Sequence, residues 1–227
     1  MIILASIHTE NFKLLSDITW ESNKLKYCEK HDYLPLSKIG GFYGVPIGFE
    51  KIAFLLDILN NIPDCSWIWW TGADSLVMNF NTKIEDKIEE ALRDDPNKHI
   101  IMTGDFNYKI NCDSILLKNS EETKNWLKSI LDSLPIYGNH MFAEQQYMLD
   151  SFDKFSDIIK LMPQNFMNSY DFKHYGDDEN GVSLAAKDVN GDRGLWESGD
   201  WLIHFPGTGW DNRINLAKEY FDKVIYE

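Results

Sequence analysis

The stretch SWIWWTGADSLVMN, residues 66–79, decides the fold class of this chain. Residues 67–70 form a short apolar run rich in aromatic side chains, which predicts a buried strand. Gly72, Ala73 and Asp74 follow it, and small residues with one carboxylate indicate a tight turn. Ligands of open α/β sheets bind beyond the carboxyl ends of strands, so Asp74 is a candidate metal ligand. A lone carboxylate in this position is equally often a turn cap.

Apolar runs and amphipathic stretches alternate along the rest of the chain. This alternation predicts an α/β layered fold, in which helices flank a mainly parallel central sheet, in one domain covering residues 1–227. Glycine-rich residues 37–45 are expected to form a loop, and 176–200 a mobile loop or short hairpin. The expected strands are 1–7, 67–70, 99–103, 114–117 and 201–204, and the expected helices are 15–31, 46–59, 83–93, 121–134, 144–155 and 216–226.

Composition excludes several classes of protein. A formal charge of −14 over 227 residues argues against a general binder of nucleic acid or anionic membranes, because phosphate-rich partners need clustered Lys and Arg. The three cysteines are an odd number without metal-binding spacing, so we expect them to be reduced. The first residues lack the charged region and the apolar length of a signal peptide or membrane span. The expected location is therefore the cytoplasm, or the host cytoplasm for a viral protein.

Several motifs together resemble those of GT-A glycosyltransferases, in particular the galactosyl/xylosyltransferase family. The aromatic strand before Asp74 resembles the family's WIWW strand and acidic turn, and GDWLIHFPG at 199–207 resembles its GDfvvHFPG block. The resemblance extends over roughly residues 1–210. It implies a Rossmann-like fold that binds nucleotide-diphospho-sugars. The other matching segments are Asn23–Lys24, Lys51–Ile52, Ile110–Asn119, Glu144–Gln145 and Asn168–Tyr170.

The resemblance implies a metal-dependent transfer of a sugar from a nucleotide sugar, expected to be UDP-linked, to a glycan hydroxyl with retention. Mn²⁺ or Mg²⁺ would be bound by Asp74 and His204, because such cations take carboxylate and imidazole ligands and stabilise a departing diphosphate. A histidine within an apolar strand is otherwise more often a core residue. Glu144 and Gln145 would lie on the acceptor side, as catalytic residues. The implied donor-binding residues are Ser6, His8, Asn23, Lys51, Thr71, Asn111 and Gly207.

The chain also departs from the family pattern. Gly72 stands where the family has the first Asp of its Asp-x-Asp motif, and Asp113 stands where the family has Gly. One hypothesis is that Asp113 supplies to the donor, and hence to catalysis, a carboxylate that Gly72 lacks; an ordinary surface Asp is the equal alternative. Ala143 replaces the first acid of the acceptor-side pair. Its absence favours front-face transfer over a covalent glycosyl-enzyme.

Two other functions remain open at this point. A phage-type transferase that glycosylates DNA bases has the same fold, but a surface that follows DNA should be basic and this chain is acidic. A catalytically inactive module that binds nucleotide sugars would explain Gly72, Ala73 and Ala143. The presence of Asp74, His204 and Glu144 argues against such a loss of activity.

Overall fold

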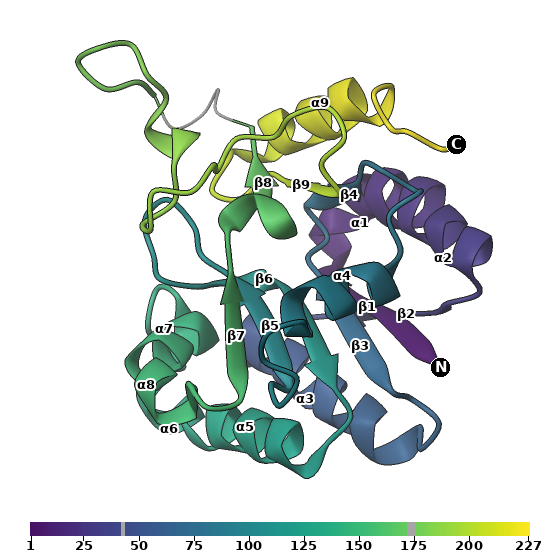
Figure 1. Ribbon diagram of the computed structural model, residues 1–227, viewed down its shortest axis with the longest axis vertical. Coiled ribbons are helices and arrows are strands. Elements are labelled where there is room, and N and C mark those ends of the chain that lie inside the picture. Colours follow the sequence, from purple (N-terminus) through teal and green to yellow (C-terminus); the bar gives the residue numbers. More distant parts are fainter. Residues whose placement is uncertain (42–43, 172–175) are drawn as a thin grey trace.

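A six-stranded sheet lies at the centre of the computed structural model, which describes residues 1–41, 44–171 and 176–227. The strand order is β2-β1-β3-β6-β5-β7 (Figure 1). β6 is antiparallel to its neighbours β3 and β5, and the other neighbouring pairs are parallel, so the prediction of a mainly parallel sheet is confirmed. The strands are β1 (Ile2–Thr9), β2 (Leu34–Gly40), β3 (Trp67–Thr71), β5 (Ile100–Thr103), β6 (Asn111–Lys118) and β7 (Ile159–Met162).

Helices cover both faces of this sheet, because successive side chains of a strand point to opposite faces. Ile3 and Ala5 pack on the side of α3, α5 and α7, whereas Ile2 and Leu4 pack on the side of α2 and α4. Each face therefore has its own apolar core. The helices are α1 (Lys13–Ser16), α2 (Leu25–His31), α3 (Ile47–Asn61), α4 (Ile84–Leu92), α5 (Glu121–Asp132), α6 (Leu134–Tyr137), α7 (Ala143–Asp150), α8 (Phe152–Phe155) and α9 (Trp210–Phe221).

A second, three-stranded sheet has the order β4-β9-β8, with β4 at Ser75–Val77, β9 at Leu202–His204 and β8 at Ser169–Tyr170. It lies between the central sheet and α9 (Figure 1). The turn at residues 72–74 carries the chain directly from β3 of the first sheet into β4 of the second. His204 pairs in register with Ser75, so the second sheet brings a distant histidine beside this turn.

The helical segment 13–31 packs against the same turn and forms hydrogen bonds with its backbone. Between α1 and α2 it runs as π-helix over Asp17–Lys24, a wide form that is rare in proteins and frequent at functional sites. Lys24 is fully buried, and its Nζ donates to the Gly72 carbonyl oxygen at 2.6 Å. The Asn23 side chain exchanges two hydrogen bonds with the backbone of Val77. The predicted helix at 15–31 thus fixes the backbone on both sides of Asp74.

Two sequence predictions are wrong in part. Residues 37–40 of the predicted loop belong to β2, an edge strand whose half-exposed side chains gave no apolar pattern; Phe42 and Tyr43 lie outside the described residues. The last helix was predicted at 216–226 but extends over Trp210–Phe221. Its start was missed because the side chains of its first turn are mostly polar and show no apolar period. Beyond it, Ile225 instead bonds to the backbone of Met78.

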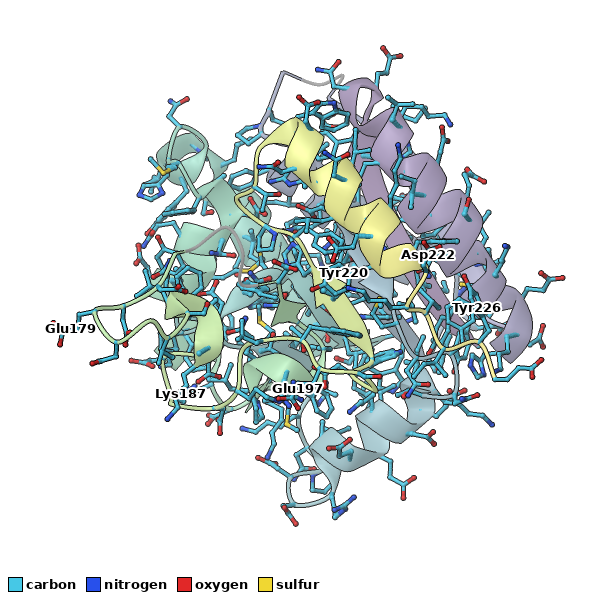
Figure 2. All side chains as sticks on the ribbon, turned by 90° about the horizontal axis from the view of Figure 1, so that it is seen from above. Glu179, Lys187, Glu197, Tyr220, Asp222 and Tyr226 are labelled. Atoms are coloured by element: carbon cyan, nitrogen blue, oxygen red, sulfur yellow. The ribbon has the colours of Figure 1, made fainter. Side chains whose placement is uncertain are left out.

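The insert at 176–200, predicted as a mobile loop or short hairpin, contains two isolated antiparallel bridges, Asp177 with Ser183 and Lys187 with Arg193; its mobility stays a prediction. Viewed from above, Glu179 and Lys187 lie at the periphery of the molecule, away from Tyr220 on α9 (Figure 2). Within the described ranges, the structure has no helix with the length and apolar character needed to cross a bilayer.

Candidate active site

A pocket of about 530 Å³ opens where β1 and β3 end, at the edge of the sheet that sequence analysis selected. Its polar lining comes from elements far apart in the chain, and Ile47, Met141 and Phe142 add an apolar part. Because acidic and basic side chains share one cavity of this size, it can accommodate a charged small molecule. The ionisable lining residues are His8, Lys51, Asp74, Cys112, Asp113, Glu144 and Arg213.

Asp74, Asp113 and His204 converge at one end of this pocket. One potential ligand atom from each lies within 4.8 Å of the others. His204 Nε2 is 3.3 Å from Asp74 Oδ1 and 3.6 Å from Asp113 Oδ2. Asp74 and His204, the two predicted metal ligands, are therefore neighbours, and Asp113 lies beside them.

The hydrogen bonding of His204 orients its other nitrogen toward the two carboxylates. Nδ1–H donates to Asn168 Oδ1 at 2.8 Å, and Asn168 is itself fully buried. In that tautomer Nε2 carries a lone pair, and this buried atom has no hydrogen-bond partner. Next to two carboxylates, this nitrogen binds either a proton or a metal cation. The site thus fits a divalent metal by its ligand types, two oxygens and one imidazole nitrogen.

Asp74 is held in its charged form. Burial by itself would raise the pKa of this carboxyl group, but a protonated His204 and the Arg213 guanidinium beside it lower the pKa to about 2. The Arg213 Nε lies 3.3 Å from Asp74 Oδ2 and also donates to the Phe205 carbonyl oxygen at 3.0 Å. Arg213 therefore brings a fixed positive charge to the pocket wall next to the metal-ligand candidates.

Glu144 lies in the first turn of α7 and forms a buried ion pair. Lys51 Nζ donates to Glu144 Oε1 at 2.7 Å, and the Lys51 side chain is only 3% exposed. Burial opposes the charge of Lys51, but Cys112 and Glu144 raise its pKa above the ordinary value. The Glu144 carboxyl group rests directly on Gly48, where an added Cβ would lie 1.6 Å from Oε2. The pair is thus fixed in one position.

The preceding residue, Ala143, has a φ of +41°, which costs an L-residue about 1 kcal/mol or more. This strained backbone turns α7 so that Glu144 and Gln145 both face the pocket. Gln145 Oε1 accepts a hydrogen bond from the Cys112 backbone at 3.2 Å. The first turn of α7 is therefore attached to β6 next to Asp113.

The fold that carries this site is similar to the folds of solved glycosyltransferases. A glycosyltransferase involved in the glycosylation of the major capsid of PBCV-1 superimposes with a TM-score of 0.74, at 16% identity over 96% of this chain and 98% of that one. The galactosyltransferase LgtC superimposes with a TM-score of 0.58, at 13% identity over 99% and 96% of the two chains. The chain has a GT-A glycosyltransferase fold.

The sequence relatives of this GT-A chain agree with its fold. The galactosyl transferase GMA12/MNN10 family matches residues 1–94. An uncharacterised α-1,2-galactosyltransferase of Schizosaccharomyces pombe is 27% identical over 90% of the chain, and an α-1,2-galactosyltransferase of the same yeast is 25% identical over 83%. The predicted resemblance to galactosyltransferases is thus confirmed. The chain spans 60% and 55% of the lengths of these two relatives.

The seven predicted donor-binding residues of this GT-A chain differ in whether they line the pocket. His8 and Lys51 line the pocket, whereas the remaining five are not among its lining residues. Thr71 is fully buried, with its hydroxyl 2.6 Å from that of Ser75 under the turn. Asn111 donates to the Tyr170 hydroxyl at 2.8 Å, and its own Oδ1 accepts from the Asp113 backbone. Their role as donor contacts stays a prediction, as it does for Ser6, Asn23 and Gly207.

Sequence reasoning missed two members of the site. Arg213 lies in the polar first turn of α9, where no motif or apolar period distinguishes it. Asn168 was noted only as part of a matching segment, yet it orients His204. Trp201, by contrast, stacks on Trp69 with ring centroids 4.0 Å apart and is a core residue.

Proposed function

We propose that this chain is a metal-dependent glycosyltransferase that moves a sugar, with retention, from a uridine diphosphate sugar to a hydroxyl group of a glycan. The observation that carries the proposal is the buried Nε2 of His204, which makes no hydrogen bond and faces Asp74 and Asp113 at the end of the pocket. The names of the curated relatives support galactose as the sugar and an α-1,2 linkage as the product.

Asp74 and His204 would hold a Mn²⁺ or Mg²⁺ ion at the diphosphate. When bound, such an ion neutralises the charge that develops on the departing phosphate oxygens. Arg213 lines the same wall, and its guanidinium is suited to a second contact with phosphate oxygens. Lys51 is less free for this role, because it is paired with Glu144.

The acceptor would bind beside the first turn of α7. There the Glu144 carboxylate, held by Lys51, and the Gln145 side chain face the pocket and can orient a hydroxyl. In front-face transfer the bond from the anomeric carbon to the phosphate oxygen breaks while the bond to the acceptor oxygen forms. The acceptor proton then passes to the departing phosphate oxygen. The alanine at 143 offers no additional nucleophile, which favours this route.

The test is nucleotide release from a panel of uridine and guanosine diphosphate sugars, with Mn²⁺ or with EDTA, for wild type and Asp74→Asn. We expect release of UDP from one donor, dependent on Mn²⁺ and lost in the variant. Tight binding of a nucleotide sugar with metal, without any release in the presence of candidate acceptors, would instead indicate an inactive binding module. Transfer to DNA bases in place of glycans would identify the other alternative.

A further inference from the structure

Gly72 and Asp113 face each other across the ends of β3 and β6. The Gly72 amide donates to the Asp113 carbonyl oxygen at 2.8 Å, directly after the antiparallel pair Thr71 and Ser114. Residues opposite each other on antiparallel strands project to the same face. A side chain at position 72 would therefore enter the space that the Asp113 side chain now occupies.

The distances around Gly72 show how small that space is. A Cβ at this position would lie 3.4 Å from Asp113 Cγ and 3.5 Å from Asp113 Cβ. It would also lie 3.0 Å from Asp74 Oδ1, tighter than nine in ten real Cβ contacts, so that this carboxylate would have to shift by a few tenths of an ångström. A carboxyl group added at 72 would thus crowd two existing carboxylates, and like charges this close oppose one another's ionisation. Carboxylates at 72 and at 113 would therefore be in van der Waals contact at the same end of the pocket, beside Asp74.

We propose that Asp113 is the third protein ligand of the metal ion bound by Asp74 and His204, and that it takes the place of a carboxylate at position 72. This inference rests on the metal site of the proposed function. The Asp113 side chain is 40% exposed and faces the pocket, with Oδ2 3.6 Å from Nε2 of His204. Asp113 Oδ1 is 3.9 Å from Lys51 Nζ, whereas Glu144 Oε1 is only 2.7 Å from the same nitrogen. Asp113 is therefore free to turn toward a cation without leaving Lys51 unpaired.

The first experiment measures binding of Mn²⁺ from the electron paramagnetic resonance signal of the free ion, with and without uridine diphosphate. We expect Asp113→Asn to weaken Mn²⁺ binding about tenfold or more. Asp95→Asn is a matched control, because the Asp95 side chain is 39% exposed and pairs only with surface Lys98 in the described residues. The control should bind Mn²⁺ as wild type does. Wild-type affinity in Asp113→Asn, together with loss of binding in Asp74→Asn, would refute Asp113 as a ligand and leave the proposed function standing. Unchanged binding in both variants, or none in wild type, would refute the metal site itself.

The second experiment tests whether a carboxylate at position 72 can take over the role of the carboxylate at position 113. Asp113→Gly should bind Mn²⁺ weakly, and the double variant Gly72→Asp with Asp113→Gly should recover to within about threefold of wild type, because it returns one carboxylate to the same space. Near-ultraviolet circular dichroism confirms that each variant is folded, and Asp113→Asn decides the ligand question if Asp113→Gly is not. A folded double variant that binds as weakly as Asp113→Gly would refute the exchange between positions 72 and 113.

Discussion

Substitution of Gly48 by alanine should break the buried Lys51–Glu144 pair. An alanine Cβ would lie 1.6, 1.9 and 2.2 Å from the three carboxyl atoms of Glu144, so that group must move by at least about 1 Å. The movement separates it from Lys51 Nζ, which is now 2.7 Å away and 3% exposed. Losing one partner of a buried ion pair costs about 3–5 kcal/mol. Replacing a helical Gly by Ala offsets at most about 1 kcal/mol. The free energy of unfolding should therefore fall by roughly 2–4 kcal/mol.

A double-mutant cycle isolates this effect. With Glu144→Ala as the background, the obstacle to a Cβ at Gly48 is gone, so Gly48→Ala should be neutral or stabilising by up to about 1 kcal/mol. The coupling energy should be about 3 kcal/mol. Urea denaturation, followed by tryptophan fluorescence, gives the free energy of unfolding of wild type, of each single variant and of the double variant. If Glu144→Ala alone is too unstable, Glu144→Ala with Lys51→Met removes both charges and provides a second background. A single Gly48→Ala variant as stable as wild type would show that the Glu144 carboxylate is not held where the structure places it.

Three further outcomes are expected. Burial, partly offset by Asp74, lowers the pKa of Lys24 to about 7, so from pH 7 upward the unfolded chain binds a proton that the folded chain lacks. Between pH 7 and pH 9 the free energy of unfolding, measured by urea denaturation, should therefore rise by about 1 kcal/mol per pH unit more in wild type than in Lys24→Met. Equal slopes in the two proteins would contradict this. Asn168→Ala should weaken Mn²⁺ binding by about 10- to 100-fold because His204 loses the partner that orients it, and unchanged affinity in a titration would exclude that role. Trp201→Ala should cost about 3–5 kcal/mol of stability by removing the ring stacked on Trp69, and a denaturation midpoint equal to that of wild type would be inconsistent with this packing.

The sequence predicted those parts of the fold that carry a strong local pattern. The buried strand at 67–70 was found because both of its neighbours are strands and its side chains are apolar on each face. β4 and β8 were missed because they have only three and two residues, too few for a period to show. β7 was missed because three of its four side chains are only partly buried.

The candidate site was predictable only as separate residues. Lys51 was assigned to the donor and Glu144 to the acceptor, from different motifs, and the structure shows that they form one ion pair. Nothing in the sequence indicates that the glycine at 48 is needed for this pair, because the clash arises between α3 and α7. Asp113 was noted as a departure from a pattern, but its distance to His204 depends on the arrangement of two sheets.

The arrangement of these sheets explains why the metal-site candidates are so widely spaced in the chain. Asp74 and Asp113 come from the ends of adjacent strands of the central sheet, whereas His204 comes from the small sheet and is joined to the turn through its pairing with Ser75. Both sheets must dock before the three side chains meet. The buried Lys24 connects the helical segment 13–31 to the turn through its hydrogen bond to the Gly72 carbonyl oxygen, and Arg213 connects α9 to the turn through its ion pair with Asp74. A cation bound between the two sheets would therefore stabilise their docking as well as a departing phosphate, because binding to the folded state alone adds to its stability.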